Sequence, residues 1–204
     1  MSFADRSELV AFCIAESHRD DLDSDMLNFL ALTEGDINLF LKTRQMTTRA
    51  QATIDAEYVA VPSSFAGPRS MAHQDGKRIE FRTPEQMTTL KAADPTSTGK
   101  PYWYSVIGDS FEMHPTPDGD YVVDLTYYLK VPPLSADATS TWLLVKHPSV
   151  YVAGIMRFVA RRARDRDEIT RRDADFNAAL GAISANDLTE NHGDRLTPSV
   201  GMVV

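Results

Sequence analysis

Residues 101–114, PYWYSVIGDSFEMH, consist of two β-prone runs on either side of Gly108 and Asp109. Aromatic and β-branched residues favour strands, and a Gly-Asp pair between two such runs favours a hairpin with a tight turn. Residues 121–130, YVVDLTYYLK, form a third run of this kind after the turn-rich segment 115–120. The three runs predict a small antiparallel β-meander in the middle of the chain.

The β-rich character extends over residues 53–134, where short apolar runs alternate with Pro and Gly. The runs at 58–61 and 78–81 are predicted to be further strands, and Pro84 begins a predicted helical turn. We therefore expect this segment to form a small antiparallel sheet or sandwich.

Both ends of the chain have helical periodicity instead. Residues 7–17 form one short helical pattern, and a second pattern runs through 24–41. Its predicted core positions are Met26, Phe29, Leu30, Leu32 or Thr33, Ile37, Phe40 and Leu41.

The helical period returns after residue 134. Pro148 stands where an early helix residue is expected, and Asp165 and Glu168 have the spacing of a capping box that starts another helix. The predicted fold is therefore α+β: the helices of residues 1–52 and 135–186 form one helical bundle, residues 53–134 are inserted as the sheet, and residues 187–204 form an extended tail.

Composition excludes several classes of protein. A chain of 204 residues can form a core without disulfides, and Cys13, inside the apolar run 9–14, is predicted to be a small core residue. A net charge of −8 argues against a surface that grips duplex DNA. An acidic wall suits a conduit through which DNA slides, although ordinary solubility explains the charge equally well.

The motifs of catalysis and metal binding are missing. The sequence has no phosphate-binding Gly-rich loop, no Gly-x-Ser-x-Gly elbow and no His-Glu-x-x-His, and its five histidines lack ligand spacing. We therefore predict no enzymatic activity, no metal site and no cofactor. Because no secretory signal and no membrane-length apolar stretch is evident, we expect a soluble protein made in the cytoplasm.

Arginines are concentrated in residues 157–172, but acidic residues alternate with them. Arg164 with Glu168 and Arg171 with Asp175 are four apart, a spacing that favours ion pairs on one helix face. A self-paired, solvated face is the first interpretation, and an interface with another protein is the second. The candidate interface arginines are Arg157, Arg161, Arg164 and Arg171.

Aromatic residues are the other candidate binding feature. Alternate strand residues point to opposite faces, so about half of them are expected in the core. The rest would form a protein-binding surface or, alternatively, a platform for sugars in a glycan-binding module. The selected candidates are Tyr102, Trp103, Tyr127 and Tyr128.

The end of the chain is apolar and β-prone although the tail has no periodicity. Such a segment suits addition to a partner's sheet edge or a groove between subunits. The residues that would make this contact are Leu196, Val200, Met202, Val203 and Val204.

Several short segments, taken in order, resemble the adaptor, or head-to-tail connector, family of tailed phages, which also occurs in gene transfer agents. They are 26–34 (MLNFLALTE), 58–65 (YVAVPSSF), 99–104 (GKPYWY), 115–117 (PTP), 125–128 (LTYY), 133–135 (PLS) and 142–151 (WLLVKHPSVY).

This resemblance implies a homo-oligomeric ring, usually of twelve copies, seated beneath the portal protein at the head-tail junction of the particle. A tail or stopper protein would bind the far side of the ring, and DNA would pass through its lumen without sequence-specific contacts. The resemblance also implies helices carrying a β-rich insertion, with the C-terminal segment reaching into the portal. On that basis the helices are expected to form the ring body, the sheet to form its tail-facing or outer lobe, and the apolar tail to bind the portal.

Overall fold

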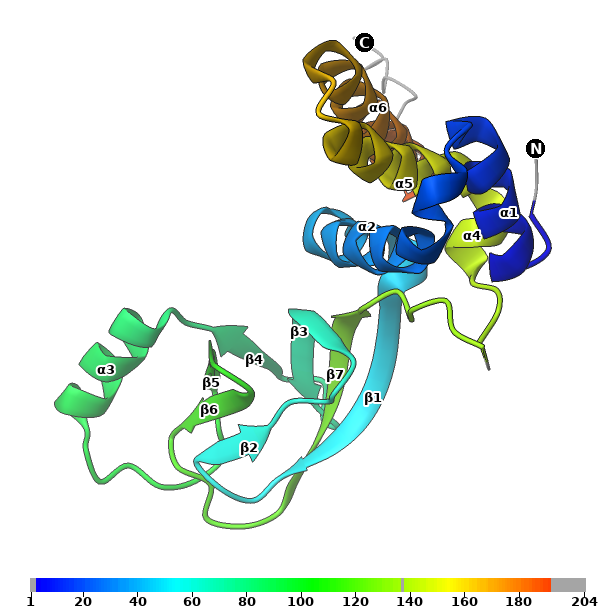
Figure 1. Cartoon of the computed structure of the whole chain (residues 1–204). Coiled ribbons are helices and arrows are strands. Elements are labelled where there is room, and N and C mark those ends of the chain that lie inside the picture. The colour runs from blue at the N-terminus through cyan, green and yellow to red at the C-terminus, as the bar shows by residue number, and fades with distance from the viewer. Residues whose placement is uncertain (1–2, 137, 192–204) are drawn as a thin grey trace, which may run out of the picture. The chain divides into compact units, whose positions relative to one another are not determined.

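Helices form both ends of the chain and strands form its middle in the computed structural model, which describes residues 3–136 and 138–191 (Figure 1). Contacts divide the chain into two compact units, a helical unit made of the residues up to Gln45 and from Val131 on, and a sheet unit from Met46 to Lys130. The mixture of helix and strand confirms the predicted α+β class.

The helical unit has local signals that fix where its helices begin. Asp5 Oδ1 accepts a hydrogen bond from Glu8 N at 2.9 Å, and Asp165 Oδ1 accepts one from Glu168 N at 3.1 Å, so each aspartate caps a helix. The helices are α1 (Arg6–Ser17), α2 (Met26–Phe40), α4 (Trp142–Lys146), α5 (Pro148–Ala163) and α6 (Arg166–Asn191), with the 3₁₀ segments η1 (Asp20–Asp25) and η2 (Arg44–Met46).

Helix α5 lies at the centre of this unit and contacts α1, α2, α4 and α6. Val150, Tyr151 and Ile155 on α5 are completely buried. Cys13 on α1 is also buried, which confirms its predicted place in the core, and burial raises the pKa of its thiol to about 12. The thiol is therefore protonated and inert at neutral pH.

The contact between α2 and α5 depends on a glycine. A Cβ added to Gly154 would lie 2.2 Å from Thr33 Cγ2 and 3.1 Å from Phe176 Cε2. Only hydrogen at this position lets α2 approach α5 so closely.

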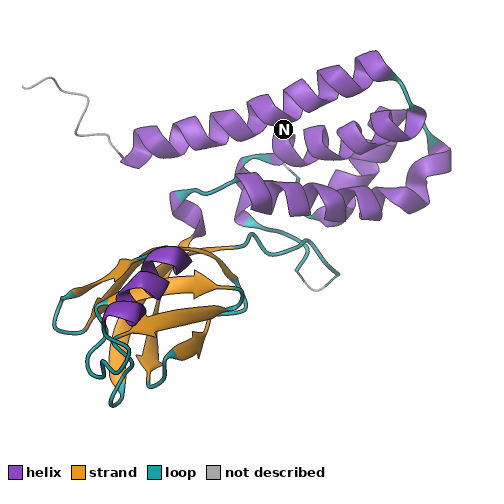
Figure 2. Cartoon of the chain, turned by 90° about the vertical axis from the view of Figure 1, so that its left-hand side faces the viewer, coloured by secondary structure: helices purple, strands orange, loops and turns teal. Residues whose placement is uncertain are grey.

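The sheet unit contains seven strands in the order β1-β7-β3-β4-β5-β6-β2, and helix α3 lies against them (Figure 2). Strands β5 and β6 pair as the predicted hairpin, with Tyr104 opposite Met113 and Gly108 in the turn at φ 56°. The elements are β1 (Thr47–Ile54), β2 (Tyr58–Ala60), β3 (Phe65–His73), β4 (Arg78–Phe81), α3 (Pro84–Ala93), β5 (Trp103–Ile107), β6 (Ser110–His114) and β7 (Tyr121–Leu129).

The prediction of a wholly antiparallel sheet is wrong at one pair, because β4 and β5 run parallel. Helix α3 connects them, and a crossover of this length is what a parallel pair needs. Strand β3 was not predicted because Gly67 and Pro68 interrupt its pattern, and the structure shows register shifts at those positions.

Two predicted boundaries of regular structure are also corrected. Strand β1 begins at Thr47, so β structure starts before residue 53. Helix α6 continues to Asn191, past the predicted end at 186, and Asp187 Oδ1 accepts a hydrogen bond from Arg44 N at 2.8 Å. That contact with a distant segment supports a stretch whose own sequence has no helical period.

A half-buried lysine fastens α3 within the sheet unit. Lys91 Nζ donates hydrogen bonds to Glu57 Oε1 and Glu112 Oε1 and lies 5.2 Å from the centre of the Tyr58 ring. Burial lowers the pKa of Lys91, but the hydrogen bonds to Glu112 and Glu57 outweigh burial and raise it overall. The hydrogen bond from Lys91 to Glu57 holds the pKa of Glu57 below its usual range.

Replacing Lys91 by Met should therefore lower the free energy of unfolding by about 1–2 kcal/mol at pH 7, since Glu112 loses its cationic partner. The pKa of Glu57 is lower in the folded state than its ordinary value. The stabilisation that Glu57 contributes is therefore present above its ordinary pKa and is lost as the pH falls through its folded-state pKa. The difference between Lys91→Met and the unsubstituted chain should thus shrink between pH 5 and pH 3 in urea unfolding followed by tryptophan fluorescence. Arg82→Met, which removes the exposed pair with Glu80, is the control and should change stability little at either pH.

Candidate functional site

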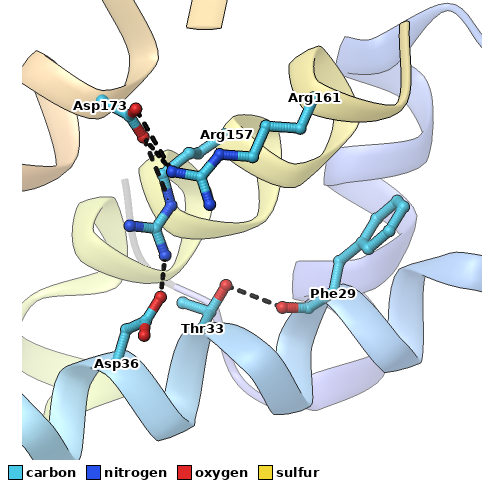
Figure 3. A network of polar contacts seen from close by, with 6 residues as sticks. All are labelled: Phe29, Thr33, Asp36, Arg157, Arg161 and Asp173. Atoms are coloured by element: carbon cyan, nitrogen blue, oxygen red, sulfur yellow. Dashed lines mark hydrogen bonds and ion pairs between the residues drawn. The ribbon is translucent and has the colours of Figure 1, made fainter. Parts of the chain in front are cut away.

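A buried arginine on α5 joins three helices (Figure 3). Arg157 Nη2 donates a hydrogen bond to Asp36 Oδ2 on α2, and Arg157 Nε lies 3.7 Å from Asp173 Oδ1 on α6. Its guanidinium carbon lies 4.3 Å from the centre of the Phe176 ring. The side chain is only 9% exposed, so Arg157 serves the interior of the helical unit.

The expectation that Arg157 faces a partner does not fit this position. Arg161, one turn later, is 45% exposed and donates to Asp173 Oδ1 at 3.0 Å. Arg157 and Arg161 therefore share one carboxylate, as Figure 3 shows.

The remaining candidate arginines lie around the turn between α5 and α6. Arg164 ends α5 in the left-handed conformation, with φ 59°, so the chain turns before Glu168. Glu168 pairs instead with Arg171 at 2.6 Å and with Arg172 at 2.7 Å. Arg161, Arg164 and Arg171 are exposed, and Arg161 and Arg171 are paired with carboxylates of their own chain, as the first interpretation of this region expects.

The candidate aromatic residues do not share one surface. Tyr102 is 46% exposed, and Trp103, half-buried, stacks on His114 with ring centres 6.0 Å apart. Tyr127 belongs to the core of the sheet unit, whereas Tyr128 is half-buried with Arg69 5.9 Å from its ring centre. The structure brings Tyr102 and Trp103 together but does not place Tyr127 on any binding surface.

Helix α2 exposes apolar side chains that were expected in the core. The prediction that Phe40 is buried is wrong, because it is 64% exposed, and of the alternatives Leu32 and Thr33 it is Thr33 that is buried, whereas Leu32 is 53% exposed. The predicted core positions Met26, Leu30, Thr33 and Ile37 are confirmed as buried. The signal was present in the sequence, since α2 is apolar on more sides than one core face requires.

The helical unit also contains an open apolar groove of about 420 Å³. Cationic Lys146 and Arg172 stand among its mainly apolar lining. The residues that line it are Phe3, Phe12, Lys146, His147, Pro148, Ser149, Val152, Ala153 and Arg172.

The described residues contain no group of three or more His, Cys, Asp or Glu side chains that could hold a metal ion. Over the same part of the chain, no helix is both long and apolar enough to cross a bilayer. The predicted contact residues of the tail, Leu196, Val200, Met202, Val203 and Val204, lie outside the residues that the structure describes.

A known protein family matches nearly the whole chain. The family is described as SU10 adaptor protein, and it matches residues 1–200. No curated protein matches the sequence.

Proposed function

The chain belongs to the SU10 adaptor protein family, a family of phage head-tail adaptors, and on that premise we propose that it is a structural subunit of a ring between portal and tail. The predicted resemblance to tailed-phage adaptors is thereby confirmed, and the ring is our proposal. The match over residues 1–200 is the observation that carries it. The particle is a virion or a gene transfer agent, with DNA leaving through the lumen of the ring.

The two units suggest a division of roles within such a ring. The helical unit offers exposed leucines and a groove, which suit contacts between proteins. The sheet unit is a continuous insertion in the chain and is the part available to bind the next tail or stopper protein. We propose no catalytic role. The candidate aromatic residues lack a common exposed face, which argues against the glycan-binding alternative.

The direct test is assembly with the portal protein of the same particle. Mixing the two should add a ring of the chain beneath the portal, seen by negative-stain electron microscopy and weighed by native mass spectrometry. If the portal ring gains no mass even when the chain is present in large excess over the portal, the proposed function is contradicted.

The apolar tail gives a second test. Deleting residues 192–204 should weaken portal binding by a factor of about 100 or more while the unfolding transition stays unchanged, because a few buried apolar side chains are worth that much. Deletion from residue 187, the predicted start of the tail, is the wrong variant, since Asp187 bonds to Arg44 N.

A full-length control separates tail length from tail chemistry. Leu196, Val200, Met202, Val203 and Val204 are all replaced by Ser, which keeps the number of residues. If this variant binds the portal as the unsubstituted chain does, the apolar side chains are not what the portal recognises.

A further inference from the structure

The side of α2 that faces away from α5 carries no charge. Leu27, Leu32 and Leu39 on this side are 49%, 53% and 68% exposed, and no charged residue interrupts them. This outward face of α2 consists of Leu27, Asn28, Ala31, Leu32, Gly35 and Leu39. A partner can cover it without removing a charged group from water, which is the main cost of burying a surface.

Leu32 and Leu39 are two turns apart, about 10.5 Å along the helix, and so project from the same side. Leucines spaced in this way are the anchors with which an amphipathic helix enters an apolar groove.

The apolar groove of the helical unit is lined by α1, α5 and neighbouring residues and is called the α1–α5 groove. Its lining complements the outward face of α2. Phe12, Val152 and Ala153 give it an apolar surface, and Lys146 adds a cation, whereas the charge of Arg172 is paired with Glu168. The segment before α2 is acidic, and Asp23 of η1 is exposed there. The outward face of α2 therefore has an anionic end, and the groove presents the cation of Lys146.

The two surfaces lie on opposite sides of the helical unit. Gly154 and Arg157 mark the side of α5 that meets α2. Gly154 abuts Thr33, and Arg157 reaches Asp36, the latter shown in Figure 3. At 3.6 residues per turn, Val152 in the groove is rotated by about 140–160° from both. The groove thus opens away from α2, and a copy cannot dock its own α2 there.

We propose that the outward face of α2 in one copy docks in the α1–α5 groove of the next copy. Because each copy carries both surfaces on opposite sides, the contact is heterologous and repeats from copy to copy. The inference rests on the proposed function only for the closure of this series into a ring. The contact itself can exist with or without the portal.

A disulfide ladder tests the geometry of the contact. The double variant Leu32→Cys/Ser149→Cys has one thiol on the outward face and one in the groove, both at exposed positions. Under oxidation it should give dimers, trimers and longer species on a non-reducing gel, whereas each single variant stops at dimers. Buried Cys13 does not take part. Absence of a ladder, both for the free chain at high concentration and in the presence of portal, overturns the proposal.

Mixing two blocked variants tests the pairing of the surfaces. Leu32→Glu/Leu39→Glu blocks the outward face, and Ser149→Trp blocks the groove. Each alone should remain monomeric, and their equimolar mixture should stop at dimers in native mass spectrometry, because only one intact face can meet one intact groove. The control Ile107→Glu charges an apolar residue of the sheet unit that is 45% exposed, and it should assemble normally.

The outcomes separate this inference from the proposed function. If the face-blocked variant still assembles on portal as the unsubstituted chain does, the docking contact is wrong and the adaptor role stands. If Ser149→Trp abolishes portal binding while no ladder forms, the groove takes a segment of the portal and the proposal is overturned. If the ladder forms but the portal gains no mass, the contact stands and the adaptor role fails.

Discussion

Replacing Gly154 by Ala is expected to lower the free energy of unfolding by about 2 kcal/mol, although alanine is the better helix former. The added Cβ meets Thr33 Cγ2 at 2.2 Å, and Thr33 is completely buried. Thr33 cannot turn away, because its side chain is stiff and its hydroxyl donates to Phe29 O at 2.8 Å. Overpacking of this kind costs about 1–3 kcal/mol and outweighs the gain of up to about 1 kcal/mol in helix propensity.

Two further variants identify the cause of this loss. Thr33→Ser removes Cγ2 and keeps the hydroxyl, so the double variant Thr33→Ser/Gly154→Ala should recover most of the lost stability. Gly181→Ala on α6 is the matched control: a Cβ there meets nothing within 4 Å, and stability should rise by about 0.5–1 kcal/mol. Chemical denaturation of the unsubstituted chain, Gly154→Ala, Thr33→Ser, the double variant and Gly181→Ala decides the matter. If the changes of Thr33→Ser and Gly154→Ala add in the double variant, Thr33 is not the obstacle.

Replacing Arg157 by Ala should have the largest effect, a loss of about 3 kcal/mol. The change removes the partner of Asp36 and Asp173 and the cation that lies over the ring of Phe176. Breaking a buried ion pair costs about 3–5 kcal/mol, and the lower value is expected because both aspartates are 34% exposed.

Arg161→Ala is the comparison for this prediction. It removes an arginine from the same helix and the same aspartate, but the Arg161 side chain is 45% exposed. Its loss should cost under about 1 kcal/mol, as for other solvent-exposed pairs. Thermal unfolding should therefore rank the Arg157 variant well below the Arg161 variant, and equal transition temperatures would mean that burial of Arg157 contributes nothing.

Features that depend on residues close together in the sequence could be predicted from it. The β5–β6 hairpin and the helix cap at Asp165 depend on residues within a few positions, and both were predicted. The helix predicted within residues 24–41 is present as α2, but Phe40 was assigned to the core because it is apolar, and the choice between Leu32 and Thr33 was left open. Periodicity shows that a residue is apolar and does not show which apolar face meets α5.

Features that depend on distant residues escaped prediction. Arg157 was predicted to lie on a charged surface because its sequence neighbours are charged. Its burial depends on Asp36, which is 121 residues away. The parallel pairing of β4 with β5 likewise depends on how α3 crosses between them. The groove was not predicted at all, since it is assembled from α1, α5 and α6.

The insertion of the sheet unit into the helical unit sets an order of events during synthesis. All the strands lie between Thr47 and Leu129, so this unit has its complete sequence as soon as Lys130 leaves the ribosome. Helix α2 must wait for α5, which follows about a hundred residues later, and until then both of its apolar faces are open to water. The nascent chain therefore carries an unprotected, aggregation-prone helix for several seconds at typical rates of translation.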